Sequence, residues 1–328
     1  MQAWRVERLA DPQEALVLRE VPVPEPGPGQ VLLRVRAVAL GFPDVLFCQG
    51  RYQVKPELPF ILGSEVCAEV VGGDLDDYLA IGTRVAANPR SGTGALAQFA
   101  LADRLNCHPV PDGLSDAEAA AVLTGSTTAW FGLFARGDLQ ADEWLVVTAP
   151  AGGVGSAAVQ LGRAEGATVI AVVRGTAKAQ VVENLGAHHI IDSTVENVVD
   201  RVKELTGGHG ADVVFDPVGG DAFDLAQRYM AYGGRYLVVG FAGGAIQAAR
   251  LNRPLLGNWS IVGVNVGLHV AREPERVQRA MVEIGRLCAE RRLVPLVGAV
   301  VPMADAPKGL QQIADGGTVG RTVVNVWE

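Results

Sequence analysis

The chain has 328 residues, a formal net charge of −8 and 49% hydrophobic residues. This length suits two domains with sizeable cores, and the negative charge argues against a nucleic-acid partner, which needs clustered Lys and Arg. No apolar run approaches the roughly 18 residues of a membrane span, so we expect no membrane partner.

The first residues form a strand-like pattern rather than the charged, apolar and small-residue succession of a signal peptide, which favours a cytoplasmic protein. No two cysteines have the spacing of a structural zinc site, so we expect them to be reduced and buried. The cysteines are Cys48, Cys67, Cys107 and Cys288.

Residues 1–120 are predicted to be rich in β-strands. The Pro- and Gly-rich stretch 21–30 predicts an extended surface turn. Further on, Ser115 and Glu118 have the spacing of a capping box and predict the start of a helix. The predicted strands lie at 31–38, 65–72 and 83–87.

Residues 121–265 alternate apolar, β-branched runs with helical patterns. This alternation predicts an α/β fold with a doubly wound parallel sheet, whose ligands lie at the carboxyl ends of the strands. Strands are predicted from Leu145 and at 167–173, 190–191, 211–215, 234–240 and 260–265, and helices from Ser156 and at 177–185, 195–205 and 223–229.

The tail predicts a long helix at 274–291 and strands near 294–302 and 322–327. We expect these strands to rejoin the β-rich domain. The predicted domains are therefore a discontinuous β-rich domain, 1–120 with 266–328, and a Rossmann domain at 121–265 inserted into it.

A glycine-rich turn follows the strand that begins at Leu145, and a helical pattern follows the turn. Strand, glycine turn and helix are the context that a dinucleotide-binding fingerprint requires, although Pro150 replaces the first glycine. Small residues let the backbone approach a pyrophosphate, and the helix amino terminus favours its charge. The alternative is an ordinary strand-to-helix turn. The predicted contacts here are Gly152, Gly153, Val154 and Gly155.

The ends of the next strands supply further candidate cofactor contacts, since they meet at the same edge of the sheet. They are Pro217, Val218, Gly240, Phe241, Val264 and Asn265.

The residue that ends the second strand selects the cofactor in such folds. An acid there would accept the ribose 2′-OH of NAD, but this chain has Arg174, with Lys178 one turn later. Both cations attract a 2′-phosphate, so we predict NADPH rather than NADH. The alternative is that both residues merely belong to a solvated surface.

Motifs along nearly the whole chain resemble the medium-chain dehydrogenase/reductase superfamily, specifically its zinc-free quinone oxidoreductase (zeta-crystallin-like) branch. The matching stretches are Gly41-Phe-Pro-Asp-Val-Leu46, Gln49-Gly-Arg-Tyr52, Leu58-Pro-Phe-Ile-Leu-Gly-Ser-Glu65, Pro111-Asp-Gly-Leu-Ser115, Ala151-Gly-Gly-Val-Gly155, Phe215-Asp-Pro-Val-Gly-Gly220 and Gly320-Arg-Thr-Val-Val324.

The resemblance implies a GroES-like substrate domain around the Rossmann domain. It also implies NADPH-dependent two-electron reduction of a quinone or an α,β-unsaturated carbonyl compound, and a homodimer built through the edge of the Rossmann sheet. Two positions depart from the branch: Gly41 replaces its usual Asn, and Arg321 replaces a common Lys.

We predict no metal at this site. Zinc-dependent relatives would place a ligand Cys at Gly41 and a ligand His at Ser64, and neither residue present here coordinates zinc. No histidine lies in this segment. The five histidines are His108, His188, His189, His209 and His269.

Without zinc, the oxygen of the substrate needs another group to stabilise its developing charge. Tyr52 is the first candidate donor because its place resembles the substrate-cleft tyrosine of the branch, and Ser64 is the second. Thr128 resembles the helix threonine that meets the nicotinamide carboxamide. The alternatives are that Tyr52 packs the cleft wall and that Thr128 bonds its own helix backbone.

Two other functions remain open. An enoyl-thioester (enoyl-CoA) reductase shares this fold and hydride chemistry, and its substrates would need a basic rim for their phosphates. A non-catalytic NADPH-binding protein would bind the cofactor without oxidising it.

Overall fold

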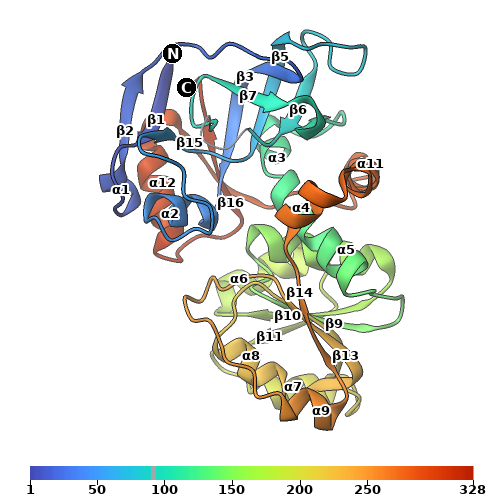
Figure 1. The fold of residues 1–328 in the computed structure, drawn as a ribbon. Helices are drawn as coiled ribbons and strands as arrows, with labels where there is room; N and C mark the ends of the chain where they lie inside the picture. The colour runs from blue at the N-terminus through green and yellow to red at the C-terminus, as the bar shows by residue number, and fades with distance from the viewer. Residues whose placement is uncertain (90–93, 328) are drawn as a thin grey trace. The chain divides into compact units, whose positions relative to one another are not determined.

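The structure is a computed structural model that describes residues 1–89 and 94–327. The chain divides into two compact units (Figure 1). The first comprises residues 1–124 and 294–328, and the second comprises residues 125–293. Among the described residues, no helix combines the length and the apolar character needed to cross a membrane.

The first unit is built on a mixed sheet in the order β15-β16-β3-β5-β6-β8, with β7 also paired to β3. The long strand β3 alternates inward and outward side chains over its first half and is buried towards its end, which fits its central place. The strands are β3 (Gln30–Leu40), β5 (Val66–Gly73), β6 (Arg84–Ala87), β7 (Phe99–Asp103), β8 (Cys107–Pro109), β15 (Val297–Pro302) and β16 (Arg321–Asn325).

A second, three-stranded sheet in the order β2-β1-β4 completes this unit. One core joins the two sheets, and it includes Leu33, Val38, Leu62 and Leu310. The remaining elements are β1 (Gln2–Val6), β2 (Leu16–Glu20), β4 (Phe60–Ile61), α1 (Pro12–Ala15), α2 (Phe42–Cys48), α3 (Asp116–Ala120) and α12 (Ala306–Ala314).

The predicted capping box is confirmed at α3. Ser115 Oγ accepts from Glu118 N at 3.2 Å, while Glu118 Oε2 accepts from Ser115 N at 2.8 Å. All four cysteines are reduced and buried, as expected.

The second unit contains the predicted doubly wound sheet. Six parallel strands run in the order β11-β10-β9-β12-β13-β14, so the chain starts in the middle and winds outward in both directions. Helices α7 and α8 pack on one face, and α5 lies on the other (Figure 1). The strands are β9 (Trp144–Thr148), β10 (Thr168–Val173), β11 (His189–Asp192), β12 (Ala211–Asp216), β13 (Met230–Val238) and β14 (Ser260–Gly263).

The helices of the second unit include one long helix near its end. That helix, α11, follows the predicted segment closely. The helices are α4 (Leu123–Trp130), whose first two residues belong to the first unit, α5 (Gly153–Glu165), α6 (Thr176–Asn184), α7 (Val198–Leu205), α8 (Asp221–Ala226), α9 (Asn252–Gly257), α10 (Val266–Arg272) and α11 (Pro274–Ala289), with a π-helical stretch at Phe131–Arg136.

Residues 266–293 belong to the second unit, whereas we had assigned them to the β-rich domain. The reason lies in their contacts. Trp130 Nε1 donates to Glu283 Oε2 at 3.0 Å, and the ring of Phe131 stacks on His269 with centroids 4.4 Å apart. These contacts tie α10 and α11 to the end of α4 and the π-helical stretch.

Candidate cofactor and substrate site

The glycine turn lies between β9 and α5, the two elements that the sequence predicted around it. Gly152 caps α5 in an extended conformation, and no side chain caps the helix, so its first-turn N–H groups can meet an anion. A Cβ on Gly155 would lie 2.2 Å from Ala149 O. Only glycine therefore allows α5 to approach the end of β9 this closely.

A buried carboxylate joins this turn to the neighbouring strand ends. Asp216, the last residue of β12, is 1% exposed. Its Oδ1 accepts from Thr148 Oγ1 at 2.5 Å, and its Oδ2 accepts from the hydroxyl of Tyr236. Asp216 also accepts from the backbone of Val218 at 2.8 Å and of Gly219 at 3.1 Å. One side chain thus links β9, β12 and β13 with the loop that follows β12.

The loops after β12 and β13 are joined to each other. Ala242 N donates to Pro217 O at 3.0 Å, and Gly243 N donates to Val218 O at 2.9 Å. These bonds bring the segment with Pro217 and Val218 beside the segment with Gly240 and Phe241. Four predicted cofactor contacts therefore share the carboxyl edge of the parallel sheet.

The last two predicted contacts of this group follow β14. Val264 N donates to Val238 O at 3.0 Å, which continues the pairing of β14 with β13. Asn265 is exposed, and its Oδ1 caps α10 by accepting from Leu268 N at 3.2 Å. The side-chain oxygen of Asn265 thus already accepts a hydrogen bond within the protein.

The two cations predicted to select the cofactor follow β10. Arg174 is exposed, and Lys178 is half-buried in the first turn of α6. Within the part of the chain that the structure describes, neither forms an ion pair. Gly175 between them has φ +92°, a conformation that glycine adopts without strain. This geometry leaves both cations available to a phosphate.

Helix α4 meets the glycine turn. A Cβ on Gly125 would lie 2.7 Å from Gly153 O, so these two backbones are in contact. Thr128 is half-buried in the same helix, one turn after Gly125. Its helix therefore brings it near the turn where a pyrophosphate is expected.

The two remaining predicted residues lie in the first unit. Tyr52 follows α2, and its ring packs on Phe47 with centroids 4.5 Å apart. Ser64 is half-buried between β4 and β5, and its carbonyl oxygen accepts from Asn88 Nδ2 at 2.8 Å. Both side chains keep a hydroxyl that can donate to a ligand.

A buried ion pair lies beside Gly41. Glu65 is fully buried, and its Oε2 accepts from Arg321 Nη2 at 2.8 Å while its Oε1 accepts from Thr124 N at 2.9 Å. Arg321 Nη2 also donates to Ala39 O at 3.1 Å. A Cβ on Gly41 would lie 3.5 Å from Arg321 Nη2, so this guanidinium is the nearest charge to the position where the branch has Asn.

A second acid lies next to this pair. Asp44 is 1% exposed, and its Oδ2 accepts from Gly41 N at 2.8 Å. Burial raises the pKa of Asp44 to about 6, although the bond from Gly41 and the charge of Arg321 oppose the rise. Asp44 Oδ1 and Arg321 Nε are buried without hydrogen bonds.

These residues do not fit a zinc ion. Gly41 has no ligand atom, Ser64 replaces a histidine, and both oxygens of Glu65 are already bonded. Across residues 1–89 and 94–327, no three His, Cys, Asp or Glu side chains form a group that could hold a metal. His188 Nδ1 instead accepts from Val169 N at 3.0 Å, and His189 stacks on Trp144.

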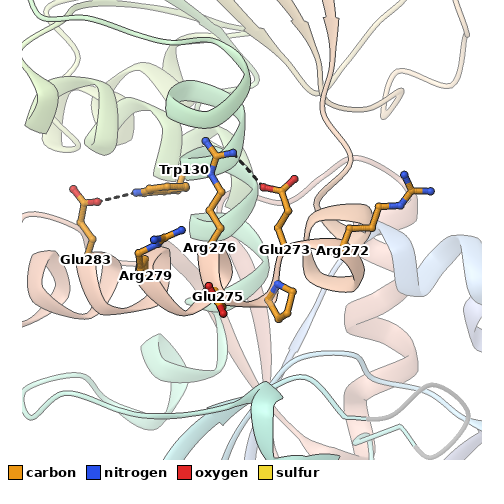
Figure 2. A pocket seen from close by; sticks show the side chains of 8 residues that line it. Trp130, Arg272, Glu273, Glu275, Arg276, Arg279 and Glu283 are labelled. Carbon is orange, nitrogen blue, oxygen red and sulfur yellow. Dashed lines mark hydrogen bonds and ion pairs between the residues drawn. The ribbon is translucent and has the colours of Figure 1, made fainter.

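A hollow of about 770 Å³ lies along α11, and none of the predicted site residues lines it (Figure 2). Its arginines and glutamates are equal in number, and two of them, Arg276 and Glu273, form an ion pair at 3.2 Å. It therefore has no net preference for an anion. The lining residues are Trp130, Arg272, Glu273, Pro274, Glu275, Arg276, Arg279 and Glu283.

Comparison with known proteins agrees with this architecture. Residues 27–135 match the family described as alcohol dehydrogenase GroES-like domain, and residues 153–284 match the family described as zinc-binding dehydrogenase. The chain belongs to the medium-chain dehydrogenase/reductase superfamily. Within it, the chain belongs to the quinone oxidoreductase branch, and it is an oxidoreductase.

Three relatives support these statements. A quinone oxidoreductase-like protein 2 homolog of Nematostella vectensis is 35% identical over 91% of this chain and 82% of its own length. A mycobacterial protein solved with NADPH is 29% identical, with a TM-score of 0.91 over 99% of this chain and 100% of that one. A mycocerosic acid synthase-like polyketide synthase of Mycobacterium tuberculosis is 29% identical over 92% of this chain but only 14% of its own length.

Sequence reasoning placed Asp216 in a motif at a strand end where ligands are expected, but it singled out neither Asp216 nor Asp44 as a site residue. Asp216 had a signal, because an acid at the end of a buried strand needs partners for its charge. Asp44 had a weaker sequence signal. It is the third residue of α2, and Pro43 is typical of the start of a helix, so this helix could have been predicted. The pairing of Glu65 with Arg321 had none, since 256 residues separate them.

Proposed function

We propose that the protein reduces quinones or α,β-unsaturated carbonyl compounds with NADPH and without zinc. The observation that carries this proposal is the Glu65–Arg321 pair beside Gly41, because both oxygens of the Glu65 carboxylate are already bonded to protein groups rather than available to a metal that could polarise a carbonyl. A conjugated acceptor spreads the developing charge, so hydrogen-bond donors can stabilise it without a Lewis acid.

The residues have the following proposed roles. When bound, NADPH supplies the hydride. Residues 152–155 hold the pyrophosphate at the start of α5, and Thr128 orients the nicotinamide carboxamide. Tyr52 donates a hydrogen bond to the substrate oxygen, with Ser64 as a second donor, and the proton comes from Tyr52 or from water.

The activity is tested by following NADPH oxidation with quinones, small enones and enoyl-CoA, with NADH in parallel. We expect turnover with a quinone or an enone, and a loss of roughly ten- to a thousandfold in kcat for Tyr52→Phe. Unchanged turnover in Tyr52→Phe would contradict its role as donor. NADPH binding without turnover of any acceptor would contradict the reductase activity.

The second candidate is reduction of an enoyl thioester. The observation that favours it is the similarity to part of a mycocerosic acid synthase-like polyketide synthase. Turnover of enoyl-CoA well above that of small enones, together with inhibition by free CoA, would establish this activity instead.

We propose Arg174 and Lys178 as the groups that hold the 2′-phosphate and favour NADPH over NADH. Both follow β10, and both are available to an anion. Arg174→Ala should raise the Kd for NADPH at least tenfold and leave that for NADH nearly unchanged. A variant that keeps its full preference for NADPH would contradict this assignment.

We also propose a homodimer formed along β14, the edge strand of the parallel sheet. An edge strand offers unpaired backbone groups to a second copy. Just before it in the sequence, Ile246, Leu251, Leu255 and Leu256 are each more than 70% exposed. Light scattering should give twice the chain mass, and Leu255→Glu should reduce it; a monomeric wild-type protein would contradict the proposal.

A further inference from the structure

An acid lies beside the residues proposed to hold the 2′-phosphate, although the sequence shows none there. Asp192 ends β11, the strand next to β10, and its Oδ1 accepts from Gly175 N at 3.0 Å. Gly175 directly follows Arg174. The parallel pairing of β10 with β11 thus brings a carboxylate beside the end of β10, the position that selects the ribose in such folds.

This carboxylate is buried and charged. Asp192 is 9% exposed. Hydrogen bonds from Thr194 N, Gly175 N and Thr194 Oγ1 hold the pKa of Asp192 below its usual value, so it is an anion at neutral pH. Asp192 N itself donates to a second acid, Glu196 Oε1, at 2.9 Å.

The bonding of Asp192 is incomplete on one side. All three hydrogen bonds go to Oδ1, whereas Oδ2 is buried without a hydrogen-bond partner. No cation forms an ion pair with Asp192 in the described part of the chain. A buried anion that no cation compensates disfavours a second anion nearby.

We propose that Asp192 is a specificity-determining residue whose negative charge opposes the 2′-phosphate of NADPH, which NADH lacks. Asp192 thereby reduces the ratio of affinities for NADPH over NADH that Arg174 and Lys178 create. Arg174 and Asp192 act in opposite directions on the same ribose, and the balance between them sets which cofactor is used. This inference rests on the proposed place of the 2′-phosphate at Arg174.

The test compares cofactor binding in Asp192→Asn with that in the wild type. Asparagine keeps the size of the side chain and an oxygen for the N–H groups of Gly175 and Thr194, but removes the charge. The Kd values for NADPH and NADH are measured by fluorescence titration. Asp200→Asn is the matched control, because it removes one exposed charge from α7 that does not contact Gly175.

We expect Asp192→Asn to lower the Kd for NADPH roughly three- to tenfold and to leave the Kd for NADH unchanged or higher. The gain should shrink as salt is added, because ions screen the repulsion. Asp200→Asn should change neither Kd by more than about twofold.

Other results would overturn the inference. Equal changes in both Kd values would make Asp192 a structural support of the turn alone, and an unchanged Kd for NADPH would place its charge out of reach of the phosphate. Arg174→Ala separates this inference from the cofactor proposal. If Arg174→Ala abolishes the preference while Asp192→Asn does nothing, only Asp192 is wrongly assigned; if neither variant changes the preference, both assignments fail.

Discussion

The variant Asp44→Asn measures the free-energy cost of burying the carboxylate that is hydrogen-bonded to Gly41 N. The pKa of Asp44 rises from 3.8 to about 6 in the fold. At 1.36 kcal/mol per pKa unit, this makes the ionised form about 3 kcal/mol less favourable in the folded state. Because the folded pKa lies above the unfolded one, this penalty is absent below about pH 4 and complete above about pH 6 to 7.

The asparagine variant carries no charge at any pH, and it keeps an oxygen for Gly41 N. We therefore expect the wild type to lose stability relative to Asp44→Asn as the pH rises, by about 1.4 kcal/mol between pH 5 and pH 8. Urea unfolding of both proteins, followed by tryptophan fluorescence across this range, measures the difference. Asp112→Asn, an exposed change in the same unit, is the control.

Parallel stability curves for the wild type and Asp44→Asn would refute this reasoning. They would mean that Asp44 is as readily ionised in the fold as in the unfolded chain, and that Arg321 compensates fully for its burial. If the wild type instead gained stability relative to Asp44→Asn as the pH rises, the pKa of Asp44 would be lowered in the fold. Its interaction with Arg321 would then be a net favourable ion pair.

Three further predictions concern the packing of the site. Arg321→Ala should lower the free energy of unfolding by about 3–5 kcal/mol, because it leaves Glu65 buried without a cation. Arg321→Lys keeps a cation and should lower it much less. Urea unfolding that shows the same loss of stability in both variants would contradict a role for the charge. Gly155→Ala should raise the Kd for NADPH at least tenfold, because the added Cβ would clash with Ala149 O. The control Gly285→Ala adds a Cβ in open space, and its Kd for NADPH in the same fluorescence titration should equal that of the wild type. Thr148→Val should lower the free energy of unfolding by about 1.5–3 kcal/mol and raise the Kd for NADPH, because it removes the hydrogen bond from Thr148 to Asp216. An unchanged Kd would show that the loop after β12 keeps its position without this bond.

The second unit was predictable because its sequence pattern is local and repetitive. The inner strands β9, β10 and β12 are apolar runs of five or six residues, and each is followed by a glycine or proline signal and a helix. The starting strand, its glycine turn and the edge strand near Ser260 follow from this pattern alone. The strand order follows as well, because right-handed crossovers leave few alternatives.

The first unit was harder to predict. The helices α2 and α12 have only seven and nine residues, so each offers few turns over which a helical period can be recognised in the sequence. The pairing of β16 with β3 joins residues nearly 300 positions apart in the sequence. The place of Asp192 beside Gly175 arises in the same way, since it depends on the register between two strands and on no local motif.

The position of β16 has a consequence for how the chain folds during synthesis. The strand lies inside its sheet, between β15 and β3, yet it is synthesised long after β3, because residues 41–320 come between them. Residues 125–293 can close their own sheet while the end of β3 still has an open edge. That edge of β3 therefore stays unpaired until Arg321–Asn325 has been synthesised, and a chain without β16 would expose it to pairing with other chains.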